Sequence, residues 1–142
     1  MGKSENRLRY SRMLQLTKFH IGGSRDGLVG VTGAWRPNKS DLELLESRLA
    51  DISVVQSQSA SKDTHIGQPS LYYRQYIAVL VGRRKLIYVN GFLDKPPSSW
   101  RKRVVNICDT GPTDWGVVYD PANTHFFDLR TNVGLPVPPP PP

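Results

Sequence analysis

Apolar and polar side chains alternate along residues 72–93 in the way expected of two adjacent β-strands. Residues 72–81 and 85–93 are rich in valine, isoleucine, leucine and tyrosine, and the break between them is Gly82-Arg83-Arg84. β-Branched and aromatic runs interrupted by glycine are typical of a β-hairpin. The pattern therefore predicts a strand, a turn beginning at Gly82 and a second, antiparallel strand.

A second pattern predicts an α-helix over residues 40–54. Ser40 and Glu43 have the spacing of a capping box, in which the serine caps the backbone N–H of Glu43 and the glutamate reaches back. Four apolar side chains recur at helical spacing: Leu42, Leu45, Leu49 and Ile52. Because a helix of this length is marginal alone in water, we expect its apolar stripe to pack on one face of the sheet.

Shorter apolar runs between turn residues predict the rest of the sheet. The runs cover residues 28–35, 103–108, 115–119 and 125–129, and turn residues occupy 109–114 and 120–123. One helix among several short strands predicts an α+β fold, with the helix packed on an antiparallel sheet of four or five strands. Asn90-Gly91 interrupts the second hairpin strand and fits either a two-residue turn or a β-bulge.

The composition divides the chain into one domain and two distinct ends. Residues 1–27 show neither a helical nor a strand period and are predicted to form a flexible basic arm. Residues 28–132 are enough for a single α+β domain. Residues 133–142 form a proline-rich tail, for which we expect polyproline II conformation. Both ends are expected to be dispensable for folding.

The net charge of +7 lies mostly in the arm. Residues 1–25 hold six basic side chains and one acidic side chain, a net charge of +5. The remaining residues hold 13 basic and 11 acidic side chains, a net charge of +2. The predicted domain is therefore close to electrically balanced, which argues against a general affinity for nucleic acid.

The chain has no run of about 18 apolar residues, so no transmembrane segment is predicted. Its first residues lack the apolar stretch of a signal peptide. As written, the sequence predicts a cytoplasmic protein, and it would predict an exported one if the true start lies elsewhere. The single cysteine, Cys108, cannot form an internal disulfide.

Residues that carry chemistry are few and scattered. The three histidines, His20, His65 and His125, lie far apart, which argues against a metal site. Cys108 and His125 have the types of a nucleophile and its base, but the acidic Asp109 beside the thiol disfavours the thiolate. Residues 109–114 lack the ligand spacing of an EF-hand and are better explained as a turn. The sequence therefore predicts a protein that is not an enzyme and has no cofactor and no metal.

Several short motifs resemble those of a family of small uncharacterised bacterial proteins. The motifs lie at residues 73–76, 87–92, 120–121 and 127–132, and Trp35-Arg36-Pro37 precedes the helix as in that family. Members are often predicted to be exported or lipid-anchored. The resemblance covers roughly residues 34–134. It implies no activity and carries over no functional residue.

The predicted order of a strand, a helix and an antiparallel meander is also similar to the cystatin architecture. Cystatins bind proteases through hairpins that carry Gln-x-Val-x-Gly and Pro-Trp motifs. Residues 78–82 keep the glycine of the first motif and lose the glutamine, and Pro112 is separated from Trp115. The likeness therefore concerns the architecture and argues against protease inhibition.

We expect a small binding or inhibitor-like module that acts through protein–protein contacts. Aromatic side chains near loops commonly anchor interfaces. The alternative is a nucleic-acid-binding protein that uses two basic clusters, one at the hairpin tip and one at a strand end. The residues predicted to bind are Trp100, Trp115, Tyr119, Arg83, Arg84, Arg101 and Arg103, with Lys85 and Lys102 completing the basic clusters. The sequence names no particular partner.

Overall fold

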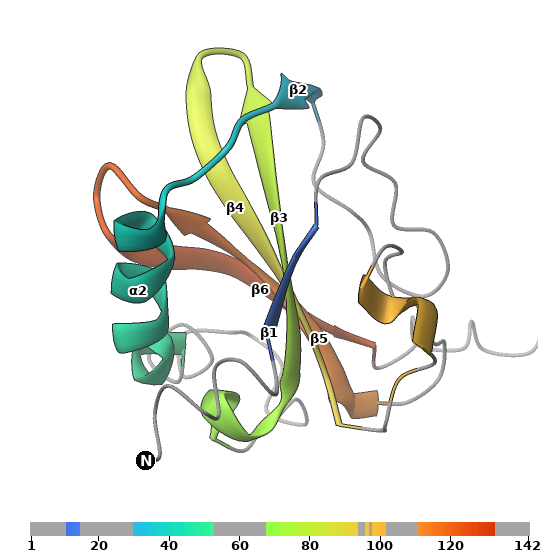
Figure 1. The fold of residues 1–142 in the computed structure, drawn as a ribbon. Helices are drawn as coiled ribbons and strands as arrows, with labels where there is room; N and C mark the ends of the chain where they lie inside the picture. Colours follow the sequence, from blue (N-terminus) through green and yellow to red (C-terminus); the bar gives the residue numbers. More distant parts are fainter. Residues whose placement is uncertain are drawn as a thin grey trace, which may run out of the picture.

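The computed structural model describes residues 11–14, 30–52, 68–93, 96, 98–101 and 111–132. Within these residues the chain forms one sheet, one α-helix and three short 3₁₀ helices (Figure 1). This arrangement confirms the predicted α+β class with an antiparallel sheet. No helix in this part of the chain is both long and apolar enough to cross a membrane.

Strands β3 (Tyr73–Val81) and β4 (Arg84–Phe92) form the predicted hairpin at the centre of the sheet. Their antiparallel pairing is unbroken over the full length of both strands. The two turn residues are Gly82 and Arg83. Gly82 has a φ of +61°, and a positive φ is what the first turn residue of the favoured two-residue hairpins requires.

Strands β5 (Gly111–Asp120) and β6 (His125–Asn132) extend the sheet beyond β4, and β2 (Val31–Ala34) pairs with β3 on its other side. All these pairings are antiparallel. β5 begins inside the segment predicted as a turn, residues 109–114. The predicted strand at residues 103–108 lies outside the described residues.

A sixth strand, β1 (Ser11–Leu14), was not predicted. It pairs in parallel with residues 74–77 of β3. β2 pairs only with residues 79–81 of β3, so β1 satisfies backbone groups along the rest of that edge. The strand lies within the segment expected to be a flexible arm, and the sheet therefore begins before residue 28. The predicted proline-rich tail lies outside the described residues.

Helix α2 (Lys39–Ser47) begins earlier than predicted because Asn38, and not Ser40, is its N-cap. Asn38 Oδ1 accepts a hydrogen bond from the backbone N–H of Asp41 (2.8 Å), and Asp41 Oδ2 accepts one from the backbone N–H of Asn38 (2.9 Å). Asparagine caps a helix as well as serine does. The earlier of two overlapping capping boxes forms, which moves the start of the helix toward the N-terminus.

The α-helix ends sooner than the predicted residue 54. Its C-cap is Arg48, and the chain continues as the 3₁₀ helix η1 (Leu49–Asp51). Leu45, Leu49 and Ile52 are nevertheless buried, so the predicted apolar stripe is retained. α2 lies beside one face of the sheet (Figure 1). The buried sheet residues in the same cluster are Tyr72, Tyr76, Ala78, Ile87, Val89, Trp115, Val117, Tyr119 and Phe126.

The opposite face of the sheet is buried too. A separate cluster there consists of Ile77, Val79, Leu86, Tyr88 and Val118. Burial on both faces explains why the hairpin strands are apolar at nearly every position and not only at alternate ones.

Asn90-Gly91 forms neither the turn nor the bulge allowed by the sequence. Both residues lie within β4 and pair in regular register with β3 and β5. Gly91 stands opposite Trp115, and a Cβ on Gly91 would lie 2.5 Å from Cζ2 and 2.8 Å from Cδ2 of that indole. The glycine is therefore needed because the tryptophan ring packs directly against the backbone of β4.

Candidate binding groove beside the β3–β4 turn

The three aromatic side chains that we expected to be exposed anchors are buried. Trp115 and Tyr119 are fully buried, and Trp100 is 7% exposed. Trp115 and Tyr119 lie on the same face of β5 because side chains alternate along a strand, and that face belongs to the cluster that includes the buried residues of α2. Trp100, in η3 (Ser98–Arg101), packs edge-on against Phe92. All three are core residues.

Among the described residues, two buried polar atoms have no hydrogen-bond partner: Trp115 Nε1 and Tyr119 Oη. Burial raises the pKa of Tyr119 above its usual value, and the nearby Arg48 only partly opposes this effect. The Tyr119 hydroxyl is therefore held neutral without a partner. Such a group destabilises a core because it has lost its hydrogen bonds to water.

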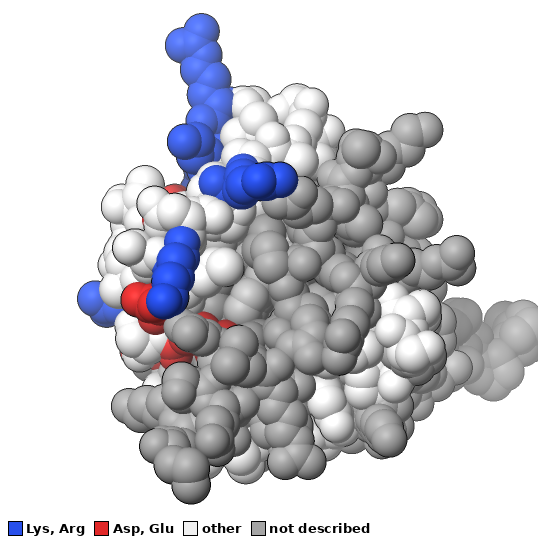
Figure 2. Space-filling view, viewed as in Figure 1, with Lys and Arg blue, Asp and Glu red and all other residues white. Residues whose placement is uncertain are grey.

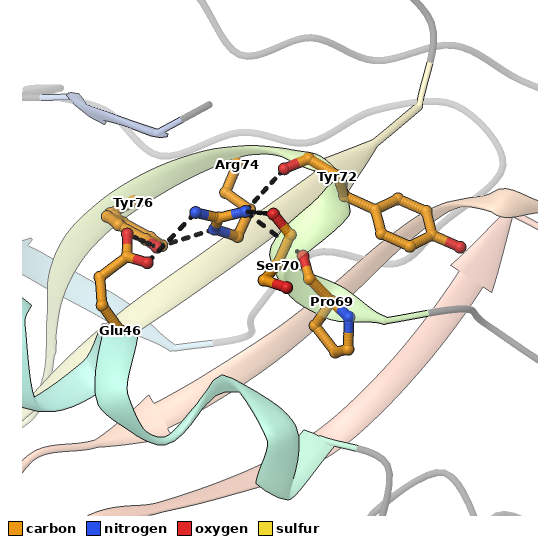
Figure 3. A network of polar contacts seen from close by, with 6 residues as sticks. All are labelled: Glu46, Pro69, Ser70, Tyr72, Arg74 and Tyr76. Atoms are coloured by element: carbon orange, nitrogen blue, oxygen red, sulfur yellow. Dashed lines mark hydrogen bonds and ion pairs between the residues drawn. The ribbon is translucent and has the colours of Figure 1, made fainter. Parts of the chain in front are cut away.

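A buried polar network joins α2 to β3 (Figure 3). Arg74 is 1% exposed, and it donates to Glu46 Oε2 (3.1 Å) and to the Tyr76 hydroxyl (3.0 Å), while Tyr76 donates to Glu46 Oε1. The same guanidinium donates to three backbone carbonyls in residues 69–72, around η2 (Pro69–Leu71).

These contacts indicate that the network stabilises the fold. A buried charge is tolerated only when it is paired and hydrogen-bonded, and Arg74 meets both conditions. Burial raises the pKa of Tyr76 well above its usual value, with Arg74 opposing the shift, so the hydroxyl remains a neutral donor. The network therefore braces α2 and η2 against the sheet.

A surface groove of about 680 Å³ lies beside the β3–β4 turn. Its walls come from the turn, from the start of α2 and from the loop between β5 and β6. We call it the hairpin groove. It is lined by Trp35, Asn38, Asp41, Arg83, Arg84, Lys85, Asp120, Pro121, Ala122 and Asn123. On the face shown in Figure 2, Lys and Arg side chains project at the end of the molecule that carries this turn, and others lie apart from it on the side of α2.

The ion pair between Arg84 and Asp120 connects two walls of the hairpin groove. Arg84 Nη2 donates to Asp120 Oδ2 (3.1 Å), and the guanidinium also lies over the ring of Phe127 at 5.7 Å. Asp120 is buried and accepts two further hydrogen bonds, from the backbone N–H of Ala122 (2.9 Å) and from Asn123 Nδ2 (3.1 Å).

Burial alone would raise the pKa of Asp120, but the hydrogen bonds from Arg84, Ala122 and Asn123 outweigh it. The pKa of this carboxyl is therefore lowered from its ordinary value of 3.8. Asp120 remains ionised at neutral pH and has three donors. Its function is to fix the loop between β5 and β6 at a set distance from the turn.

Trp35, in the segment between β2 and α2, also lines the groove and contacts Lys85. The indole Nε1 donates to the backbone carbonyl of Leu86 (2.9 Å), which fixes the ring against β4. The Lys85 ammonium lies 5.6 Å from the centre of that ring, within the range of a cation–π contact. Lys85 is therefore positioned by the side chain of Trp35.

The hairpin groove carries three cations and two carboxylates. Asp41 belongs to the capping box at the start of α2, and Asp120 is paired with Arg84. In the part of the chain that the structure describes, neither Arg83 nor Lys85 forms an ion pair. The groove thus has a small positive excess located on these two side chains.

The other residues considered as candidates from the sequence do not line the hairpin groove in the described part of the chain. The side chain of Arg101 and all of Arg103 lie outside the described residues, as do Cys108, His20 and His65. His125 begins β6, where its ring lies 5.6 Å from that of Phe127. Among the described residues, no cluster of His, Cys, Asp and Glu could hold a metal ion.

The comparisons with known proteins leave the geometry as the only guide to function. The chain matches no protein-family model, no curated protein and no solved structure. The resemblance to a family of small bacterial proteins therefore stays a prediction.

Sequence reasoning found the cations of the hairpin groove but not their partners. The sequence pattern places Trp35 at the entry to the helix and Asp120 at the start of a turn. Both meet the hairpin tip only in three dimensions, since Arg84 and Asp120 lie 36 residues apart and Trp35 bonds a residue 51 positions away. The sequence did contain one signal for the pair of Arg84 and Asp120. The basic hairpin tip begins β4, Asp120-Pro121 ends β5, and the two strands have similar lengths, so antiparallel pairing brings these two ends together.

Proposed function

We propose that this protein is a non-enzymatic binding module that acts through protein–protein contacts and that its contact surface is the hairpin groove. The observation that carries the proposal is the combination, in one open hollow, of an indole with two cations that have no ion-pair partner in the described part of the chain. The aromatic residues first expected to provide the surface belong to the core.

Mixed charge in the hairpin groove supports a protein partner. A nucleic-acid site is generally lined by many cations that contact phosphates, and its affinity grows with their number. Here two carboxylates, Asp41 and Asp120, share the lining with the three cations. Protein interfaces commonly combine an aromatic or arginine centre with polar side chains of both signs.

The residues of the groove also support a non-enzymatic role. Asp120 has three hydrogen-bond donors, and Asp41 belongs to a helix cap. A general acid or base needs a titratable group within reach of a substrate, and a nucleophile needs such a base beside it. Both carboxylates of the groove already take part in contacts that hold the fold, which supports a structural use of these groups.

Nucleic-acid binding is the second candidate, and Arg83, Arg84 and Lys85 beside Trp35 are the observation that favours it. Aromatic and basic side chains together suit single strands. The finer prediction on architecture, a cystatin-like meander, is supported by the order β2, α2, β3, β4, β5 and β6 and stays a proposal.

Affinity capture from extracts of the native host tests the proposal. The baits are the full chain, Arg83→Glu, and Lys39→Glu, a matched control because Lys39 is exposed, loses the same charge and lies outside the groove. We expect a protein captured by the first and third baits and lost with Arg83→Glu, with nuclease treatment leaving capture unchanged. Capture that nuclease abolishes would instead support the second candidate, and capture retained by Arg83→Glu would refute the role of the groove.

A further inference from the structure

The three consecutive cations at the hairpin tip differ in what they contact. Arg84 is paired with Asp120 and lies over Phe127. Arg83 is exposed in the turn, and Lys85 is exposed on the ring of Trp35. Arg83 and Lys85 can therefore form new ion pairs without competing with a pair that holds the fold.

The contacts of Arg84 make it part of the wall of the groove. Its partner Asp120 also accepts from Ala122 and Asn123, so the Arg84–Asp120 pair links the hairpin tip to the whole loop between β5 and β6. A ligand that drew Arg84 away from Asp120 would leave this buried carboxylate short of its charged partner. Leaving one member of such a pair unpartnered is unfavourable.

Two available cations suit a ligand that carries few negative charges. The salt dependence of binding to B-DNA follows the number of phosphates neutralised, and two contacts give a slope of only about −2 in log affinity against log salt. A protein segment with a few Asp or Glu side chains can form ion pairs with two cations and needs no further positive charges in the groove. The carboxylate of Asp41 also lines the groove, and its negative charge repels a ligand with many closely spaced negative charges.

We propose that the hairpin groove binds an acidic segment of a partner protein, with Arg83 and Lys85 contacting its Asp or Glu side chains and Arg84 acting as a positioning residue. This inference rests on the proposed function and specifies the chemistry of the partner. Trp35 supports it by holding Lys85 over its ring and by offering an apolar surface beside the two charges.

The test is a nuclear magnetic resonance titration of the ¹⁵N-labelled full chain with an oligo-glutamate peptide at about 0.15 M salt. We expect shifts in the indole N–H of Trp35 and in the backbone amides of Arg83, Lys85 and Ala122. The double variant Arg83→Gln, Lys85→Gln should bind on the order of tenfold more weakly with an unchanged melting temperature. Lys39→Gln should bind like the wild type.

Arg84→Gln separates positioning from direct contact. It should lower the melting temperature and shift the amide of Asn123 before any peptide is added, which neither Arg83→Gln nor Lys85→Gln should do. If Arg84→Gln weakens peptide binding without these changes, Arg84 contacts the peptide directly and its positioning role is refuted.

Two further outcomes would overturn the acidic partner. Oligothymidylate that shifts the same signals more strongly than oligo-glutamate would show a nucleic-acid ligand. No shift with oligo-glutamate at millimolar concentration, together with protein capture that still depends on Arg83, would show that the groove binds a protein of different chemistry. In that second case the proposed function stands and only the acidic partner is refuted.

Discussion

Replacement of Gly91 by alanine should destabilise the protein because of one contact across the sheet. Gly91 pairs with Trp115, and a Cβ at position 91 would lie within 2.8 Å of several atoms of the indole. Those atoms belong to the middle of a rigid, fully buried ring. Neither the ring nor the paired strands can move aside without disturbing neighbours in a closely packed core.

The size of the effect follows from two opposing terms. Overpacking a well-packed core destabilises by about 1–3 kcal/mol. Replacing glycine restricts the unfolded chain and returns about 0.4–1 kcal/mol. We therefore expect Gly91→Ala to lower the free energy of unfolding by about 1–2 kcal/mol, which corresponds to roughly 4–8 °C in melting temperature for a domain of this size.

Urea denaturation followed by circular dichroism measures this change. Gly33→Ala is the matched control, since its Cβ would meet only Leu80 Cδ1 at 3.5 Å, an ordinary contact, and it should keep the wild-type stability within about 0.5 kcal/mol. In a Trp115→Leu background the obstructing ring atoms are gone, and Gly91→Ala should have little further effect. Equal stability of Gly91→Ala and Gly33→Ala, or a loss that persists in the Trp115→Leu background, would refute the reasoning.

Three further predictions concern the core, the groove and the edge of the sheet. Tyr76→Phe removes a buried hydroxyl with two partners, Arg74 and Glu46, and should destabilise by about 1–3 kcal/mol, whereas Tyr119→Phe removes a buried hydroxyl without a partner among the described residues and should be neutral or stabilising in the same urea assay. Because the pKa of Asp120 is lowered in the folded protein, its ionised carboxylate stabilises the fold above pH 3.8, and this contribution is lost as the pH falls through the folded pKa. Asp120→Asn should accordingly lower the urea midpoint at neutral pH, and its difference from the wild type should shrink in acid; a difference that does not depend on pH would contradict this. A chain that begins at residue 15, without β1, should melt at least about 4 °C below one that begins at residue 11, and equal melting temperatures would show that β1 contributes nothing to stability.

The hairpin and the existence of the helix could be predicted because both depend on local patterns. Residues 73–81 and 84–92 carry the β-branched and aromatic side chains of strands, with a glycine at the turn position that needs a positive φ. The apolar stripe of α2 is likewise visible in one short window. The N-cap was displaced by two residues because Asn38 and Ser40 begin capping boxes of identical spacing, and the sequence pattern does not rank them.

Other features depend on residues distant in the chain and could not be predicted locally. Asn-Gly favours a turn in isolation, but the packing of Trp115 on Gly91 requires a flat, continuous strand there. β1 is four residues long and forms because the edge of β3 is open beside β2. The burial of Trp115 and Tyr119 follows from the burial of both faces of the sheet, since residues 114–120 are all buried whichever face they lie on. Nearness to a loop was therefore a poor guide to their exposure.

The candidate site shows how contacts, and not residue types, decide what a charged cluster can do. Arg83, Arg84 and Lys85 are consecutive cations, and each carries a formal charge of +1. The structure gives Arg84 a buried carboxylate, gives Lys85 an aromatic ring and leaves Arg83 at the tip of the turn. A count of charges would assign all three to one polyanion, whereas their contacts assign two to a ligand and one to the wall that positions it. This division makes substitutions at Arg83 and Arg84 informative in different ways, since the first should change binding alone and the second should change stability as well.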